Sequence, residues 1–451
     1  MIIIRCSSLL LNEKKYILNT ILNEFLGLKY KYIVDEQSTR FKLSLPEGKD
    51  LYLNATWWAK ADNELLNIKS LPSAKLITNK FTPEDDIPLL FGNELIDINE
   101  NIDCGIDIFA TCFYMLSRME EAINTEHDEH NRFPAVASNA YQNNYLERPI
   151  VDEYVEMLWN MLSYLDPTLE RKTSASENFI TCDVDWPFDP VRLSFSKTFR
   201  TSISDLIRRK SVISSLGRWK RYIFEQLKIK QADSFRDSLD WIMNVNEKAG
   251  NKVAFYFITE FTSEFDSDYD FDSKAMRKLF TEINVRGHEI GLHPGYNSFD
   301  NTINFKKSAE KLRTILKEEN IEQTILGGRM HYLRWDVLTT PKLWEENGFD
   351  YDSTLSFADK SGFRCGTSRE YTMFDLVERK PLKLKQRPLI NMECTILDNQ
   401  YENYGYNDEA LDRFKYFKEL TSKYKGTYTL LWHNSHFENE ADKTFYKELI
   451  K

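Results

Sequence analysis

Along the second half of the chain, short apolar runs alternate with longer amphipathic segments. Runs rich in β-branched and aromatic residues, such as Val253–Ile258, predict buried strands, and apolar residues three or four positions apart, as in Ser234–Glu247, predict helices. The same patterns predict strands at Phe179–Cys182, His288–Leu292, Gln323–Gly327, Tyr351–Leu355, Leu389–Ile396 and Thr427–His433, and helices at Ser273–Val285, Phe305–Glu319, Asp336–Glu346 and Asp408–Tyr424. About seven strands alternating with helices predict parallel βαβ units closed into a slightly incomplete barrel, with an open doubly wound sheet as the main alternative.

The first part of the chain, to about residue 170, has a different pattern. One helix is predicted from Asp107, a favourable N-cap, through Met119, and another is predicted from Pro149 through Met161. Short β-rich runs in this part are Lys31–Val34, Phe41–Leu45 and Leu51–Leu53. We therefore predict a mixed α/β domain over residues 1–170, a polar link, and an α/β barrel over residues 178–451.

Composition narrows the functional classes. The 451 residues are 42% hydrophobic and 29% charged, which is typical of a soluble globular protein, and the net charge of −11 argues against a nucleic-acid partner. Six scattered cysteines without a CxxC pair fit a reducing compartment. Arg5 interrupts the short apolar start, and no apolar run approaches the roughly 18 residues that a spanning helix needs. We expect a cytoplasmic protein.

One segment, residues 203–230, is basic although the whole chain is acidic. Apolar residues interleave with its cations, which predicts one or two basic amphipathic helices inserted after the first barrel strand. Such helices can pack the barrel onto the first domain. They can also face an anionic partner, for which we expect the diphosphate of a nucleotide-linked or lipid-linked sugar, or peripheral contact with the anionic inner face of a membrane.

The first candidate for chemistry is Asp183-Val184-Asp185, at the end of a predicted strand. Residues i and i+2 of a strand share a face, so both carboxylates can enter one pocket, where one can bind a cation and the other can take a proton from water. The pair can also be an ordinary loop cap. A glycosyltransferase would use the same DxD pattern to hold a metal and a diphosphate.

The second candidate is Gly287-His288-Glu289-Ile290-Gly291-Leu292-His293. It resembles the zincin HExxH, but the two histidines are five positions apart and would face opposite sides of a helix or a strand. We expect His293 to be a metal ligand and His288 to be structural. The HxxH pair His127 and His130 has a ligand-like spacing, but its polar neighbours favour a solvated loop.

Two further motifs follow predicted strands. Arg329, in Gly-Gly-Arg-Met-His-Tyr, can orient a carboxylate, although an exposed surface arginine is the plain alternative. His433, in Leu-Leu-Trp-His-Asn-Ser, ends the last predicted strand. In a closed barrel that strand neighbours the first one, which favours a functional histidine over a structural one.

Together these motifs carry a family resemblance. The region from about residue 178 to 440 resembles the NodB-type polysaccharide deacetylases (carbohydrate esterase family four), because TCDVDWP, GHEIGLHPGYN, GGRMHY and LLWHNS occur in the family's order. The stretch Ser361–Thr367 is similar to a segment of a divergent branch that often carries an uncharacterised N-terminal domain.

The resemblance implies a metal centre. It makes Asp185 a ligand and Asp183 the general base, although the extra residue between them would allow the roles to be exchanged. His293 matches the family's first metal histidine, but the second falls on Asn297, whose carboxamide is a weaker zinc ligand than imidazole. We therefore expect a divalent metal, zinc by resemblance, that is loosely bound, replaced by a harder ion, completed by Ser298 or His331, or lost.

The resemblance also implies the remaining roles. Arg329 would orient the base, and His433 would be the general acid. Side chains near the motifs that we expect to bind substrate are Trp186, His331, Tyr332, Arg364 and Trp432.

The implied activity is metal-assisted hydrolysis of an N-acetyl or O-acetyl group on a sugar of a cell-surface glycan or its precursor. A non-catalytic barrel that binds glycan or organises an assembly is the first alternative, because of Asn297. A DxD glycosyltransferase is the second, and it leaves His293 and His433 without a role.

Overall fold

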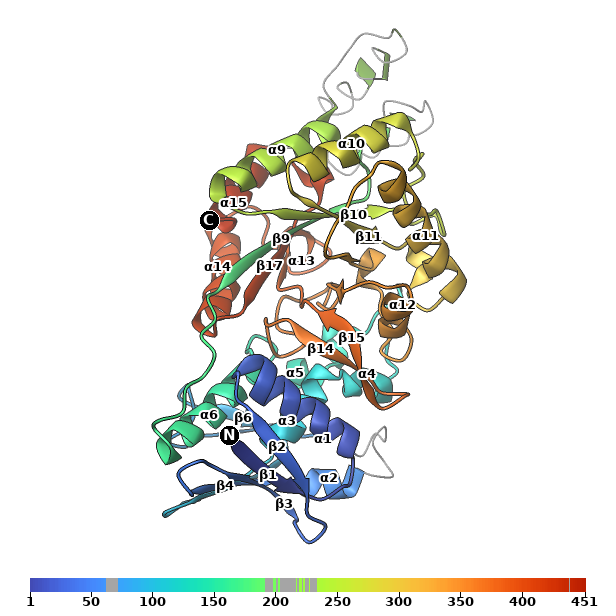
Figure 1. The fold of residues 1–451 in the computed structure, drawn as a ribbon. Coiled ribbons are helices and arrows are strands. Elements are labelled where there is room, and N and C mark those ends of the chain that lie inside the picture. The colour runs from blue at the N-terminus through green and yellow to red at the C-terminus, as the bar shows by residue number, and fades with distance from the viewer. Residues whose placement is uncertain are drawn as a thin grey trace.

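The computed structural model describes residues 1–61, 72–190, 233–437 and 439–451, with a few single positions between 191 and 232. Within these residues the chain forms an N-terminal domain with a mixed sheet and a larger domain with a mostly parallel sheet (Figure 1). The predicted α/β architecture is therefore confirmed. The basic segment 203–230 lies almost wholly outside the described residues, so its helices stay a prediction.

The N-terminal domain is built on a six-stranded sheet with the order β2-β1-β3-β4-β8-β7. Its strands are β1 Ile2–Cys6, β2 Tyr30–Val34, β3 Arg40–Ser44, β4 Asp50–Asn54, β7 Gly92–Ile98 and β8 Ile102–Ile106. β1 pairs in parallel with β2, as β4 does with β8, and the other pairs are antiparallel. The three strands predicted from sequence in this part correspond to β2, β3 and β4, whereas β1 was not predicted.

The helix α3 (Ile108–Leu116) of this domain begins at a buried N-cap, Asp107. Asp107 caps α3 by accepting from the Ala110 N–H, and it also accepts from Trp58 Nε1. Burial raises the pKa of Asp107 to about 7. Arg118, with a left-handed φ of 53°, separates α3 from α4, so the helix predicted through Met119 is two helices. The other elements are α1 Leu11–Leu18, a π-helix Asn19–Phe25, α2 Thr56–Ala61, α3 Ile108–Leu116, α4 Met119–Ile123, α5 Asn139–Gln142, α6 Ile150–Leu165 and the β5–β6 pair, Lys75–Ile77 and Ile87–Leu89.

The larger domain has a nine-stranded sheet with the order β14-β15-β13-β12-β11-β10-β9-β17-β16. Only β14 and β15 pair antiparallel. The sheet curls, because the rings of Phe179 on β9 and Tyr351 on β13 lie 5.7 Å apart although three strands separate them. The strands are β9 Glu177–Val184, β10 Val253–Ile258, β11 Glu289–His293, β12 Gly327–Gly328, β13 Tyr351–Asp352, β14 Tyr371–Asp375, β15 Lys380–Gln386, β16 Asn391–Met392 and β17 Thr427–Leu431.

Helices cover the outside of this curled sheet (Figure 1). Their capping residues explain where they begin: Asp233, Ser273 and Asn301 each accept backbone N–H groups of the first turn. The helices are α9 Ser234–Ala249, α10 Lys274–Val285, α11 Thr302–Glu318, α12 Thr340–Glu346, α13 Glu393–Leu397, α14 Asp408–Lys423 and α15 Glu440–Leu449.

Two predicted strands are wrong for identifiable reasons. Most of Gln323–Gly327 is not a strand, because the Gln323 side chain bonds both the N–H and the C=O of Ile290 at 2.7 Å and so replaces a backbone partner. Leu389–Ile396 is only the two-residue β16 followed by α13. β12 needs its two glycines, since a Cβ on Gly328 would meet the Leu292 carbonyl oxygen at 2.0 Å.

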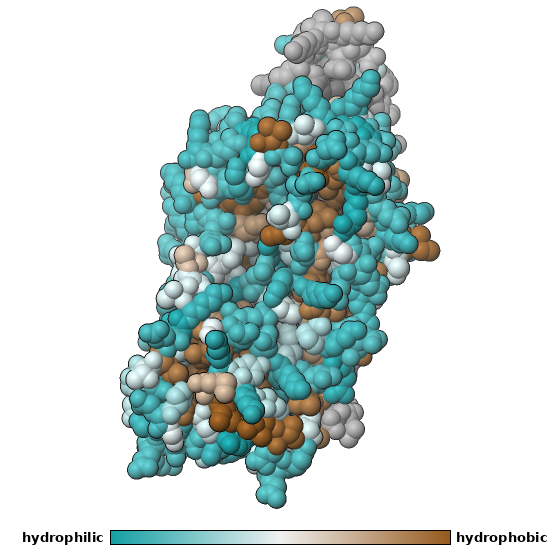
Figure 2. All heavy atoms as spheres, in the orientation of Figure 1, coloured by the Kyte–Doolittle hydropathy of each residue, from teal (hydrophilic) through white to brown (hydrophobic). Residues whose placement is uncertain are grey.

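The two domains are joined by direct contacts. The Phe363 N–H donates to the Leu146 carbonyl and the Val151 N–H donates to the Gly366 carbonyl, both at 2.8 Å, so the segment 361–367 lies against the first domain. The face shown in Figure 2 is largely hydrophilic, with apolar side chains gathered toward its lower end on the N-terminal domain. In the described parts of the chain, no helix combines the length and the apolar character needed to cross a membrane.

Candidate active site

The predicted chemical residues converge at the carboxyl ends of the barrel strands. A pocket of about 250 Å³ lies there, lined by side chains that follow β9, β11, β12 and β17 and by Arg132 of the N-terminal domain. Because these strands are parallel, residues far apart in sequence meet at one end of the sheet. The lining includes Asp183, Asp185, His293, His331, Tyr332 and His433.

Three side chains of this pocket form a candidate metal centre. Asp185 Oδ1 lies 3.5 Å from His293 Nε2 and 3.6 Å from His331 Nε2, distances suited to three ligands of one ion. Asp185 Oδ1 is buried and has no hydrogen-bond partner among the described residues. Burial raises the pKa of Asp185, but the adjacent rings of His293 and His331 outweigh burial and hold the pKa well below its usual value.

Both histidines point Nε2 toward Asp185. His293 Nδ1 lies 2.6 Å from the Arg329 carbonyl, which can only accept, so Nδ1 carries a proton and Nε2 is the nitrogen left for a cation. His331 Nδ1 donates in the same way to Asp266 Oδ1 at 2.7 Å. A second hydrogen bond of this kind fixes the ring of a metal-binding histidine, so the donor set fits a divalent cation.

The structure places Asn297 outside this group. Its Nδ2 donates to the Thr262 carbonyl at 2.9 Å, and its Oδ1 lies 3.3 Å from Arg334 Nη1. His331, which the sequence analysis assigned to substrate binding or to completing the metal site, occupies the third position instead. His331 lies 38 residues after His293, outside the motif of His293, so the fold and not a motif spacing decides between it and Ser298. Ser298 is buried and does not line the pocket.

Asp183 is held by a buried arginine. Arg329 Nη1 donates to Asp183 Oδ1 at 2.8 Å and to Thr181 Oγ1 at 2.9 Å. Its Nε and Nη2 donate to the backbone and hydroxyl oxygens of Ser353. The predicted pairing of Arg329 with a carboxylate is thus present, and it leaves Asp183 Oδ2 near the metal centre, 3.8 Å from His293 Nε2.

His433 is held by a carboxylate that the sequence analysis missed. Glu393 Oε1 accepts from His433 Nδ1 at 2.5 Å and from the His433 N–H at 2.9 Å. Burial lowers the pKa of His433, but the charge of Glu393 outweighs this effect, and the pKa lies well above its usual value. The pattern over Leu389–Ile396 predicts a strand, whereas Glu393 begins the helix α13, so its pairing with His433 is not predictable from the sequence.

The N-terminal domain supplies part of the pocket wall. Arg132 Nε donates to Asp128 Oδ2 at 2.7 Å, and its Nη1 donates to the Tyr332 carbonyl at 3.2 Å. His130 Nδ1 lies 3.1 Å from the Tyr296 hydroxyl, while His127 is exposed and bonds the Thr125 carbonyl. The HxxH pair therefore does not form a metal site.

Several other predicted residues have structural surroundings. Trp432 is fully buried between Phe414 and Phe437, and Trp186 is half-buried beside Tyr269; neither lines the pocket.

Arg364 and His288 are also held in place structurally. Arg364 is buried and makes two hydrogen bonds to Glu121, so it joins the domains instead of reaching the pocket. His288 is buried, and its Nδ1 accepts from the Val253 N–H at 3.1 Å, which is the structural role expected for it.

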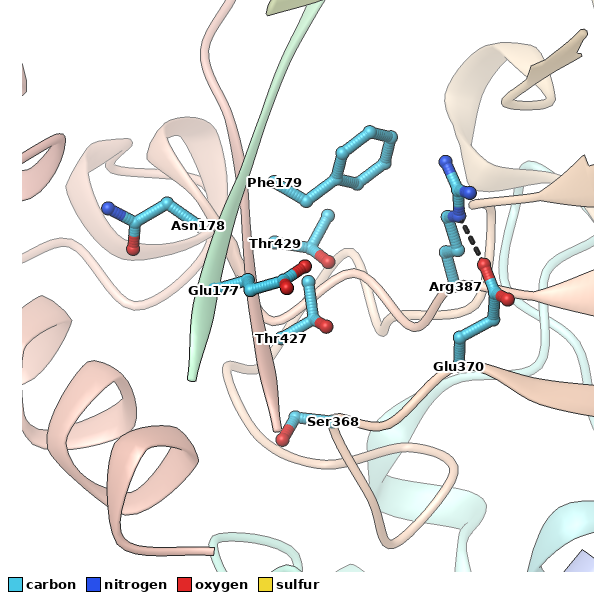
Figure 3. Close-up of a pocket in the computed structure, with 8 residues that line it drawn as sticks. All are labelled: Glu177, Asn178, Phe179, Ser368, Glu370, Arg387, Thr427 and Thr429. Atoms are coloured by element: carbon cyan, nitrogen blue, oxygen red, sulfur yellow. Dashed lines mark hydrogen bonds and ion pairs between the residues drawn. The ribbon is translucent and has the colours of Figure 1, made fainter. Parts of the chain in front are cut away.

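A second hollow lies at the opposite ends of β9 and β17 (Figure 3). It has a volume of about 360 Å³, and Arg387 in its wall is paired with Glu370 at 2.5 Å and stacks over Tyr351. None of the metal-ligand groups found among the described residues falls there. The chemistry is therefore concentrated at the other end of the barrel.

Comparisons with known proteins are consistent with a distant relation only. A family model described as a family of unknown function (DUF7033) matches residues 2–167. No protein with a curated description matches the chain.

Solved structures give weak likenesses. A structure described as a polysaccharide deacetylase from Mycobacterium smegmatis has a TM-score of 0.39 at 14% identity, covering 62% of this chain and 85% of that one. Another, described as a polysaccharide deacetylase from Pseudomonas aeruginosa PAO1, has a TM-score of 0.34 at 15% identity, with 51% and 69% covered. A structure of Puue allantoinase has a TM-score of 0.31 at 14% identity, covering 47% of this chain and 65% of that one. With TM-scores below 0.5, none of these likenesses supports an argument about activity.

Proposed function

We propose that the chain is a metal-assisted hydrolase that removes an acetyl group from a sugar, with an N-acetyl group as the preferred substrate and an O-acetyl group as the alternative. One observation carries this proposal. A single pocket brings together three groups: Asp183 with its arginine, the Asp185–His293–His331 group, and His433 with its carboxylate. The choice of an acetylated sugar rests on the resemblance of the four sequence motifs.

The side chains divide the chemistry between them. Asp185, His293 and His331 would hold the cation, which supplies Lewis-acid polarisation of a carbonyl and a lowered pKa of water when bound. Asp183 accepts the proton of the attacking water, and Arg329 keeps its carboxylate oriented. His433 is held protonated by Glu393 and gives that proton to the departing nitrogen.

The setting of the reaction is part of the proposal. We propose that the enzyme acts in the cytoplasm on a glycan precursor linked to a lipid or nucleotide carrier. Tyr332 and Tyr401 in the pocket wall offer aromatic surface to a sugar ring. The lysines and arginines within residues 203–230 carry positive charge, which would attract a diphosphate carrier.

Acetate release tests the proposal. Full-length protein would be assayed with N-acetylglucosamine oligomers and O-acetylated sugars, separately with Zn²⁺ and with Mn²⁺. Asp183→Asn and His433→Ala should each lower turnover by roughly 10²–10⁴-fold, because each removes a proton-transfer group. His127→Ala, an exposed histidine of the N-terminal domain, is the matched control and should keep the wild-type rate. Binding of the sugars without acetate release from any of them would contradict the proposal.

A further inference from the structure

A second group of side chains that could hold a metal ion lies at the same pocket, and three of its four members line the pocket. Glu393 and Cys394 begin α13, and His433 and His436 belong to the turn after β17. One ligand atom from each of the four lies within 4.8 Å of the others. The proposed reaction uses Glu393 and His433 but gives no role to Cys394 or His436.

The spacing of these atoms matches a tetrahedral zinc site. Bonds of about 2.3 Å to sulfur and about 2.0–2.1 Å to nitrogen place two ligand atoms of one tetrahedron roughly 3.3–3.6 Å apart. Cys394 Sγ lies 3.7 Å from His436 Nδ1 and 3.9 Å from His433 Nδ1. Glu393 Oε1 lies 3.1 Å from His436 Nδ1. Only the 2.5 Å contact between Glu393 and His433 is much shorter, and it is a hydrogen bond that an ion would replace.

The donor types select the ion. A thiolate with two imidazoles favours zinc over magnesium, calcium or manganese, whereas the Asp185 group has no sulfur donor. Cys394 is the one cysteine of the six that is not buried, and all six lie in the described residues. Glu393 is 1% exposed, and its Oε2 has no hydrogen-bond partner in the described part of the chain. Four protein ligands would close the coordination sphere, as in structural zinc sites.

We propose that Glu393, Cys394, His433 and His436 form a second, zinc-selective site, and that zinc bound there switches the hydrolase off by occupying Nδ1 of His433. Binding releases the Nδ1 protons of His433 and His436 and the Cys394 thiol proton to solvent. His433 then keeps only the Nε2 proton of a neutral imidazole, which is far too weak an acid to protonate a leaving group. The site itself does not depend on the proposed function, whereas its inhibitory effect does.

Cobalt binding tests the site without reference to activity. Titration of the metal-free full-length protein with Co²⁺ should give two equivalents, and one of them should produce a thiolate-to-cobalt charge-transfer band in the near ultraviolet. Cys394→Ser should lose that band and one equivalent, and Asp185→Asn should lose the other equivalent and keep the band. Cys104→Ser, a buried cysteine of the N-terminal domain, is the matched control and should keep both. A wild type without the band, or a band that survives in Cys394→Ser, would overturn the proposal.

Zinc inhibition tests the effect. With Mn²⁺ at the Asp185 group, one equivalent of Zn²⁺ should lower the wild-type rate of acetate release on the order of 10²-fold, because the general acid is withdrawn. The rate of Cys394→Ser with Mn²⁺ should be nearly the same before and after the zinc addition. A wild-type rate that is unchanged by zinc would overturn the switch. If no acetate is released with any metal while the cobalt results hold, the site stands and the proposed function fails.

Discussion

Replacement of Glu393 by glutamine tests how the pocket keeps a protonated histidine. Glu393 is buried, and its Oε1 lies 2.5 Å from His433 Nδ1. Glutamine keeps the shape of the side chain and one acceptor oxygen but removes the negative charge. The substitution therefore isolates the electrostatic contribution of Glu393 to the pKa of His433.

The contact distance sets the size of the effect. At an effective dielectric constant of about 20, two unit charges about 4 Å apart attract by about 4 kcal/mol. Relaxation and the partial exposure of His433, 15% of its side chain, reduce this attraction, and its loss in Glu393→Gln should lower the pKa of His433. His433 acts as an acid only while protonated, so the rate is present below its pKa and is lost as the pH rises through it. The alkaline limb of the profile should therefore move to lower pH.

The assay is the pH dependence of kcat/KM for acetate release, measured with Mn²⁺ so that the second site stays free of zinc. Glu289→Gln is the matched control, because this carboxylate lies inside the same barrel but bonds Tyr351 at the other end. Its profile should follow that of the wild type. An alkaline limb that stays in place in Glu393→Gln, or that moves to higher pH, would refute the electrostatic role of Glu393.

Three further predictions concern stability. Burial lowers the pKa of His288 from 6.5 to about 4, so its stabilisation of the fold is present above pH 6.5 and is lost as the pH falls toward 4. Over this range the free energy of unfolding of the wild type, measured with urea, should fall by about 3 kcal/mol more than that of His288→Gln. Arg364→Met should destabilise the chain by about 1–3 kcal/mol, because the nearly buried carboxylate of Glu121 loses two hydrogen bonds although it keeps its pairing with Arg118; a smaller loss in the double variant with Glu121→Gln, measured by urea unfolding, would show the coupling. Gly328→Ala should lower the thermal midpoint, since the new methyl group meets the Leu292 carbonyl oxygen; an unchanged midpoint in a calorimeter would contradict this expectation.

Elements with a long periodic pattern and a good cap could be predicted from the sequence. β10 has the bounds predicted for it, and α9 and α10 begin beside Asp233 and Ser273, which cap them. The fold class follows from this regularity, because alternating strands and helices permit few arrangements. Asp183, Asp185 and His293 could be placed at one pocket because each ends a parallel strand.

The rest of the site depends on side chains that meet only after folding. His331 reaches the metal centre from the turn after β12, and that strand was itself misplaced because the Gln323 side chain imitates a backbone partner. Arg364 carries a charge typical of a binding residue, but its partner Glu121 lies 243 residues away. Such pairings between distant residues cannot be predicted from a local sequence pattern. For the same reason the motif spacing assigned Asn297 to the metal site, whereas its side chain contacts Thr262 and Arg334.

The Arg132 contact with the Tyr332 carbonyl bears on how this chain can evolve. Arg132, in one wall of the pocket, lies 45 residues before the first strand of the barrel. Recombination that joined this barrel to a different leading domain would exchange that wall together with the domain. Substitutions at positions 128–132 would therefore change the shape of the pocket, and with it the ligands that fit, although no barrel residue had changed.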